Sequence, residues 1–535
     1  MLAYLKQQIN KFNNTKTYLV ITNLFLVCFL ILFNNLGVLP MRTGDFVFFA
    51  FLVLALALYR PGWAFMFFVG TIAMENINLA PESLGIILRP YQLIGGLLFL
   101  AIAIKFLTKK LYFKLVRPNW LDYLVFLIPL AGLLNIINSQ NALAGIKFAL
   151  ILFSFAILFL LTRNYIQNTV DLKKSLPFFL GSSLVIMLYG FWQNNRFAHK
   201  LNSFAVMPGR PNSTLTEPDW LGLYLILILT SLFALIYFFI QKGDEENQLK
   251  KQTSLAVIYV YLILAFTLLI ISVARSAWLG AIAMTILFLV AIFYGWQWKV
   301  IIKIKLGIIS AFFISLGIVY FFQLTTFQLF DRAVSTGGLQ KITISCNPDC
   351  GRDALQCVST GVTIHDISEL TQYGCRQINL EEIETEKKQG RFVTEIKRDD
   401  PNVSVRAEVY RKSWLQIKAH PILGIGWENI ATVLGKDARG INLNSSNIFL
   451  ETYLGSGIIG FVSLIIIFIT IFVRAIIAFY REVDLEQKTF ALFVLISWTG
   501  IIVFNLFNAG IMLGFFWVWL GIGSGSGLKS PLSAR

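Results

Sequence analysis

The chain has few of the polar residues on which soluble enzymes depend. Only 14% of its 535 residues are charged, and only three are histidines: His199, His365 and His420. These histidines show no metal-ligand spacing, and the sequence contains no Walker loop, HExxH motif or GxSxG motif. The familiar signatures of soluble enzymes are therefore missing, and any catalysis must use other groups.

Ionisable residues are also almost absent from the middle of the apolar segments. Lys105 and Lys147 lie within a turn or two of segment ends, where a lysine side chain can extend to the membrane surface. Ion-coupled transporters usually keep acidic residues near the membrane midplane for their coupling ions. The pattern therefore weighs against a transporter.

Apolar residues are abundant and make up 56% of the chain. A helix needs about 20 consecutive apolar residues to cross a bilayer, and such runs recur along almost the whole sequence. We therefore expect an all-α polytopic integral membrane protein with about 12–14 transmembrane helices. The candidate spans are 18–36, 46–59, 62–75, 91–107, 121–138, 143–162, 174–194, 219–241, 254–272, 277–297, 301–322, 454–476, 489–507 and 510–526.

Lysines and arginines are distributed unevenly between the loops. With the N-terminus inside, twenty-two fall in inner segments and six in short outer loops. The positive-inside rule then predicts an inner (cytoplasmic) membrane protein with both termini cytoplasmic. It also accounts for most of the net charge of +16, so we do not expect a nucleic-acid partner. We expect three parts: a helix bundle over 1–322, a large extracytoplasmic loop over 323–445, and C-terminal helices over 446–535.

Four of the five cysteines lie in this large loop: Cys346, Cys350, Cys357 and Cys375. An even set of cysteines on the oxidising side of a membrane predicts two disulfides, whose connectivity cannot be deduced from sequence. The alternative is a metal site with four thiolate ligands. The spacings do not give paired CxxC motifs, which favours the disulfides and a chain without metal.

Polar and cationic groups meet the outer ends of the spans at three places. The first is the loop 194–219, with PGRPNSTLTEPDWLG and Arg210; the second is SVARSAWLG, with Arg275; the third is 404–460, with Arg406. A guanidinium group suits phosphate recognition, because its planar fork can bind two oxygens at once. The alternative for each arginine is a lipid-headgroup anchor or a structural ion pair.

Taken together, the three places resemble the O-antigen ligase and Wzy-type polymerase superfamily of membrane glycan ligases and polymerases. The resemblance rests on SVARSAWLG, RAEVY at Arg406, HPILGIG at 420–426 and SNIFLETYLGSGIIG at 446–460, in this order. It covers about 207–460, and the N-terminal helices resemble the family only in architecture. It implies substrate-binding roles for Ser446, Asn447 and Glu451.

One position departs from the pattern of the family. Many of its ligases have a histidine, the proposed base, where this chain has Ser446, and a serine hydroxyl is too weak a base to replace it. Glu217 is our candidate for the base. The alternative is that Glu217 is a helix N-terminal carboxylate, favoured by the helix dipole. Glu451 could equally be a structural partner for Arg406.

The resemblance implies transfer of a glycan from a polyprenyl diphosphate to an acceptor on the outer face of the membrane. Negative charge builds on the departing diphosphate, and Arg210, Arg275 and Arg406 could stabilise it without a metal or other cofactor. The acceptor could be a glycan, a lipid or a protein, and membrane lipids surround the chain. The alternatives are a polysaccharide polymerase of the same superfamily, a transporter or flippase of lipid-linked sugars, and a membrane scaffold without enzymatic activity.

Overall fold

The structure is a computed structural model that describes residues 14–138, 141–207, 209–242, 248–293, 298–325, 339–347, 363–364, 368–378, 383–399, 401–436 and 442–525. The chain divides into two compact units. The helical unit comprises Met1–Leu324 and Leu415–Arg535, and the insertion unit comprises Thr325–Trp414. The predicted loop 323–445 thus contains the whole insertion unit together with a stretch that packs with the helices.

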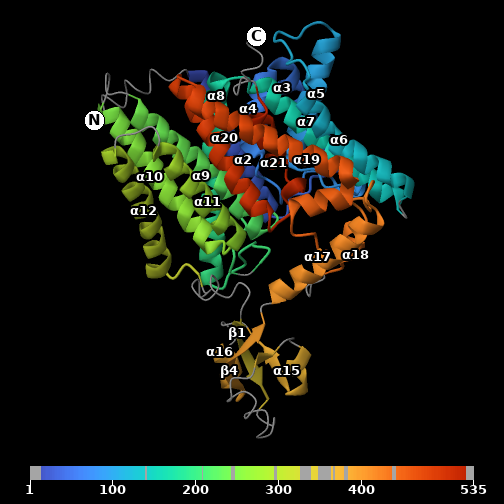
Figure 1. Ribbon diagram of the computed structural model, residues 1–535, viewed down its shortest axis with the longest axis vertical. Coiled ribbons are helices and arrows are strands. Elements are labelled where there is room, and N and C mark those ends of the chain that lie inside the picture. Colours follow the sequence, from blue (N-terminus) through green and yellow to red (C-terminus); the bar gives the residue numbers. More distant parts are fainter. Residues whose placement is uncertain are drawn as a thin grey trace. The chain divides into compact units, whose positions relative to one another are not determined.

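Apolar helices build the helical unit (Figure 1). Its helices are α2 (Asn14–Asn35), α3 (Thr43–Tyr59), α4 (Pro61–Thr71), η1 (Glu82–Leu84), α5 (Pro90–Leu107), α6 (Trp120–Leu134), η2 (Asn135–Asn138), α7 (Ala142–Tyr165), α8 (Thr169–Ala198), α9 (Pro218–Gln241), α10 (Gln248–Ile271), α11 (Arg275–Phe293), α12 (Trp298–Phe321), α18 (Ile430–Leu434), α19 (Ile448–Arg481), α20 (Leu485–Asn505), η4 (Gly510–Met512) and α21 (Gly514–Gly523). Helix α17 (Pro401–Ala419) begins in the insertion unit and ends in this one.

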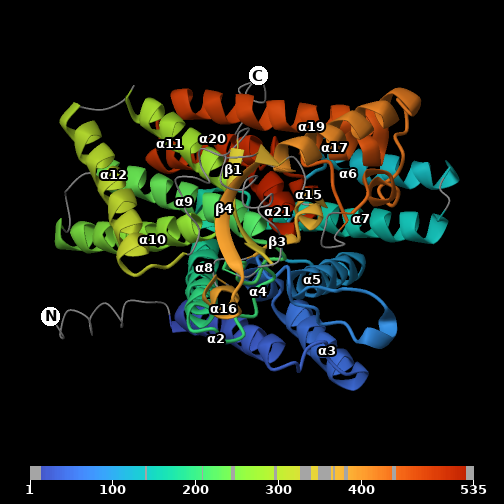
Figure 2. The same cartoon turned by 90° about the horizontal axis from the view of Figure 1, so that it is seen from below.

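Ten of the described helices are long and apolar enough to cross a membrane, and α3, α6 and α21 are shorter apolar helices. This confirms the all-α polytopic membrane class. The chain turns a corner between α3 and α4, because Pro61 is the first residue of α4 and cannot continue α3. Helix α9 is the most enclosed span: 78% of its apolar window is buried, against 22% for α2 at the edge of the unit (Figure 2).

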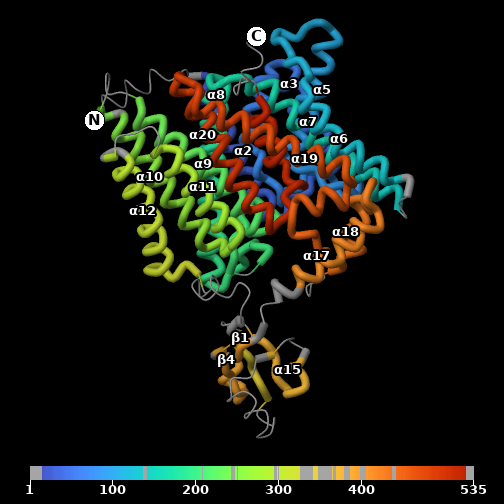
Figure 3. The backbone as a smooth tube through the Cα atoms, viewed as in Figure 1, coloured from blue at the N-terminus to red at the C-terminus, as the bar shows by residue number. Residues whose placement is uncertain are grey.

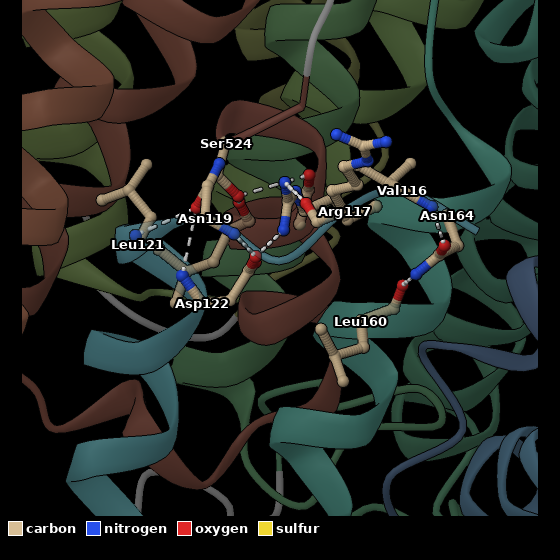
Figure 4. A network of polar contacts seen from close by, with 11 residues as sticks. Val116, Arg117, Asn119, Leu121, Asp122, Leu160, Asn164 and Ser524 are labelled. Carbon is tan, nitrogen blue, oxygen red and sulfur yellow. Dashed lines mark hydrogen bonds and ion pairs between the residues drawn. The ribbon is translucent and has the colours of Figure 1, made fainter.

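Polar contacts hold together the start of α6 and the end of α7, at the ends of these helices opposite the insertion. Asn119 caps α6 by accepting hydrogen bonds from Leu121 N at 2.9 Å and Asp122 N at 3.3 Å (Figure 4). The carboxylate of Asp122 pairs with buried Arg163 of α7. Asn164 Oδ1 accepts a hydrogen bond from Val116 N at 2.8 Å. These contacts hold the start of α6 against the end of α7, because a buried charge is tolerated only when it is paired.

The insertion unit contains a four-stranded sheet of order β2-β4-β1-β3. The strands are β1 (Leu339–Cys346), β2 (Thr363–Ile364), β3 (Cys375–Gln377) and β4 (Phe392–Asp399), with short helices α15 (Ser368–Gln372) and α16 (Ile383–Lys388). Strand β1 pairs antiparallel with β3 and β4, and β2 pairs parallel with β4. Ile342, Ile344, Ile364, Leu370 and Ile396 form its apolar core.

A disulfide and a buried carboxylate reinforce this small core. Cys346 and Cys375 face each other on β1 and β3 and form a disulfide. Cys350 and Cys357 lie outside the described residues, and a site in which all four thiolates bind a metal is incompatible with this bond. Glu386 accepts a hydrogen bond from Ser345 at 2.6 Å and pairs with two arginines. The Ser345 bond and these guanidinium groups lower the pKa of Glu386.

Candidate active site

Hydrogen bonds join the loops at one end of the helical unit. Helix α12 leads from this end into the insertion and α19 begins at it, so we call it the insertion end. It includes the loops 72–89, 199–217, 272–274 and 506–513. Figure 3 traces the chain through the helices that these loops connect. Asn76 N donates to Thr214 O at 2.9 Å and Asn194 Nδ2 donates to Leu324 O at 2.7 Å, so distant segments meet here.

Arg210 connects two of the three places that the sequence singled out. Its Nε donates to Ser272 O at 3.0 Å, and one terminal nitrogen reaches Val273 O and Asp219 Oδ1, each at 3.3 Å. Ser272 and Val273 form the turn that ends at Arg275. The side chain of Arg210 is only 12% exposed, which favours this fixed arrangement. The structure therefore brings Arg210 to the base of the Arg275 turn.

The third place reaches the same end of the unit through the loop after α20. Asn508 Nδ2 donates to Ser276 Oγ at 2.7 Å, directly beside Arg275. Asn447 Nδ2 donates to Leu506 O at 3.1 Å. The loop 506–513 thus lies between the Arg275 turn and the start of α19, and sets their spacing.

The predicted substrate-binding residues shape the start of α19. Asn447 is its N-cap and accepts hydrogen bonds from Phe449 N at 2.9 Å and Leu450 N at 3.2 Å. Ser446 has a left-handed backbone with φ of 50°. Buried Glu451 accepts a hydrogen bond from Ser445 N at 2.7 Å. Both the Asn447 and Glu451 side chains therefore hold the turn that presents Ser446.

The two glycine-rich motifs form one joint. Helix α19 is broken at Gly457, where φ is 59° and ψ is −162°. The backbone of the HPILGIG loop fills the break: Ile425 N and Gly426 N donate to Leu454 O at 2.8 and 3.1 Å, and Ile458 N donates to Ile422 O at 3.1 Å. Groups that the broken helix leaves unpaired are satisfied in this way, as buried backbone requires.

Glycine is required where these two backbones touch. A Cβ atom on Gly424 would lie 2.4 Å from Leu454 O, and one on Gly457 would lie 2.0 Å from Ile422 O. Both residues also have positive φ. Trp427 closes the joint by donating to Ser456 Oγ at 3.0 Å. The spacing of glycines in the two motifs is therefore explained by close backbone contact.

Glu217 occupies the N-cap position of α9, and its side chain makes no capping hydrogen bond. It lies two residues before Asp219, which pairs with Arg210. This position agrees with the alternative of a helix N-terminal carboxylate and also keeps Glu217 in the loop that carries Arg210. Its role as a base stays a prediction.

A buried ion pair at the insertion end was not singled out from the sequence. Glu75 Oε2 lies 2.7 Å from Arg89 Nε, accepts from Tyr91 Oη at 2.9 Å, and its other oxygen accepts from Gly514 N at 2.9 Å. Burial raises the pKa of Glu75, while Arg89 and the two hydrogen bonds oppose that rise. The carboxylate ties the loop 72–89 to α5 and α21. Only the position of Glu75 beside an apolar run could have signalled this.

Residues 260–465 match the family model described as O-Antigen ligase. This match supports a relationship of residues 260–465 to the O-antigen ligase and Wzy superfamily. The matched residues run from α10 into α19, and include the Arg275 turn, the HPILGIG loop and the whole glycine joint. A search of curated proteins finds no match.

The O-antigen ligase match contains some of the predicted site residues and not others. Arg275, Arg406 and the Ser446 turn fall inside it, whereas Arg210 and Glu217 precede it. Arg406 lies on α17 within the insertion unit. The structure therefore groups Arg210, the Arg275 turn and the start of α19 at one end of the helical unit, and the catalytic role of each residue stays a prediction.

Proposed function

We propose that this chain transfers a glycan from a polyprenyl-diphosphate-linked donor to an acceptor on the outer face of the inner (cytoplasmic) membrane. The observation that carries the proposal is the bonding of Arg210 to the turn that ends at Arg275. It keeps two cations at the end of an apolar helical unit, where the diphosphate of a membrane-embedded lipid would lie. The family match supports the same class of substrate.

The reaction is a displacement at the anomeric carbon. An acceptor hydroxyl forms the new glycosidic bond, the bond from the anomeric carbon to the diphosphate oxygen breaks, and the lipid diphosphate leaves with the electron pair. The acceptor proton passes to a base, for which Glu217 is our candidate. Arg210, Arg275 and Arg406 stabilise the charge that builds on the diphosphate, and each such contact contributes about 10²–10³ in rate.

Reconstitution with a lipid-linked oligosaccharide tests this mechanism. Arg275→Ala and Arg406→Ala should each lower the rate of transfer by about 10²–10³. Glu217→Gln should lower it and flatten the acid side of its pH profile, because a glutamine cannot accept the proton. Arg42→Ala removes the same charge from an exposed position in another loop and should leave transfer unchanged. Unchanged transfer in all three site variants would refute the proposed site.

The product distinguishes a ligase from a polymerase of the same superfamily. A ligase adds its glycan to a different carrier, whereas a polymerase adds it to another copy of the repeat unit. Chain-length analysis of the product after a single donor is supplied separates the two reactions. The orientation is tested by labelling Cys346 and Cys375 in whole cells after reduction. Labelling that occurs only from the cytoplasmic side would contradict an external site.

A further inference from the structure

A cavity of about 330 Å³ lies between α8, α9, α20 and α21. This is within the size range of small-molecule binding sites. Its walls carry aromatic side chains, including Phe179, Phe238, Phe493 and Trp519. Ile72, in the loop 72–89, and Phe515, near the start of α21, also line it. The cavity is separate from the site residues at the insertion end: its lining residues on α8, α9 and α20 lie mostly in the halves of these helices that point away from that end, and neither Arg210 nor Arg275 lines it.

The walls offer no unused hydroxyl donors to a ligand. Ser175, Ser231 and Thr489 line the cavity, and each hydroxyl donates to a carbonyl of its own helix, at 3.1, 2.8 and 2.7 Å. A polar occupant would lose its hydrogen bonds to water without replacing them. The interior therefore suits a hydrocarbon chain.

Two opposite charges line the cavity at one end. Lys173, near the start of α8, pairs with Glu486, near the start of α20, and Thr169 donates to the same carboxylate at 3.4 Å. The side chains of Lys173 and Glu486 are 47% and 34% exposed, so both remain accessible to a ligand. Lys173 Nζ also lies 5.2 Å from the centre of the Phe238 ring, which lines the same cavity. These two residues form the mouth of the cavity.

We propose that the cavity binds one acyl chain of a zwitterionic phospholipid, whose phosphate contacts Lys173 and whose ammonium contacts Glu486. A phospholipid joins a hydrocarbon chain to a phosphate, as the apolar walls and the lysine require. The adjacent carboxylate selects a headgroup that also carries a cation. An anionic lipid would bring its phosphate close to Glu486 but has no cationic group to pair with the Glu486 carboxylate. A polyprenyl chain held by the arginines would leave this charged mouth unused.

The experiment measures lipid binding and not glycan transfer. A negative result would therefore refute the lipid site without bearing on the proposed reaction. The purified full chain is depleted of lipid and mixed with phosphatidylethanolamine or phosphatidylglycerol, and bound lipid is counted by native mass spectrometry. We expect one phosphatidylethanolamine per chain, with a preference of about tenfold over phosphatidylglycerol, as one charged contact can supply. Equal retention of both lipids would overturn the headgroup assignment.

Two variants and a control locate the lipid. Ala234→Trp fills the cavity from α9 and should abolish retention, and Glu486→Gln should bring the two lipids to equal retention. Ile286→Trp adds the same ring to an exposed position on α11 that does not line the cavity, and should change nothing. Retention by Ala234→Trp, an unchanged preference in Glu486→Gln, or a polyprenyl phosphate as the bound species would each refute the proposal.

Discussion

Replacing Gly457 by alanine tests whether the broken helix is built on backbone contact. The new Cβ atom would lie 2.0 Å from Ile422 O and 2.5 Å from Leu423 C, and both are backbone atoms that cannot rotate away. The backbone at Gly457, with φ of 59° and ψ of −162°, lies in a region that is almost restricted to glycine. Strain of this kind costs about 1–3 kcal/mol and overpacking costs about 1–3 kcal/mol more, so we expect a loss of about 2–6 kcal/mol.

The assay heats the detergent-solubilised protein and measures the monodisperse fraction by size-exclusion chromatography. Gly317→Ala is the matched control, because Gly317 lies within α12 and a Cβ atom added there would meet no other atom within 4 Å. Alanine at that helical position should be neutral or slightly stabilising. If Gly457→Ala melts at the same temperature as Gly317→Ala, the contact between the two motifs is not what holds the joint.

Three further predictions concern buried charge and the insertion unit. Glu75→Ala should cost about 3–5 kcal/mol of stability, because it leaves the largely buried guanidinium of Arg89 without its carboxylate. The control Glu82→Ala, at an exposed site, should not change the melting temperature. Replacing Cys346 and Cys375 by alanine opens a loop with a separation of 29 residues and should cost about 3–4 kcal/mol, seen as faster proteolysis of the insertion. Folding lowers the pKa of Glu386, so its carboxylate stabilises the folded insertion unit at a pH above the unfolded pKa. This stabilisation is lost as the pH falls below about 4. Glu386→Gln should therefore make proteolysis of the insertion less dependent on pH in acid.

Local chemistry was sufficient to predict the class of fold, and it also explains the corner at Pro61. Long apolar runs can be satisfied only by helices in a bilayer, and proline cannot donate the hydrogen bond that would continue α3. The same reasoning located the loop of Arg210 and the turn of Arg275. It could not show that the two meet, because 62 residues separate Arg210 from the carbonyl of Ser272 that it contacts.

The break in α19 and the Glu75 pair depend on tertiary contact. Hydropathy treated 454–476 as one span, whereas α19 runs from Ile448 to Arg481 and is interrupted at Gly457. An apolar run does not reveal such a break, because the carbonyl that excludes a side chain there comes from another loop. Glu75 and Arg89 are likewise brought together by a loop whose path the sequence pattern does not determine.

Both connections of the insertion unit to the helices are fixed by hydrogen bonds to the main chain. Asn194 binds the carbonyl of Leu324, immediately before the insertion unit, and the HPILGIG loop is held in the break of α19 soon after it. The chain between these two anchors can therefore change in length and sequence without moving the glycine joint. The insertion unit would then tolerate exchange: replacing the segment between Leu324 and α17 by a different domain, with Arg406 retained on α17, should preserve the arrangement around Arg210.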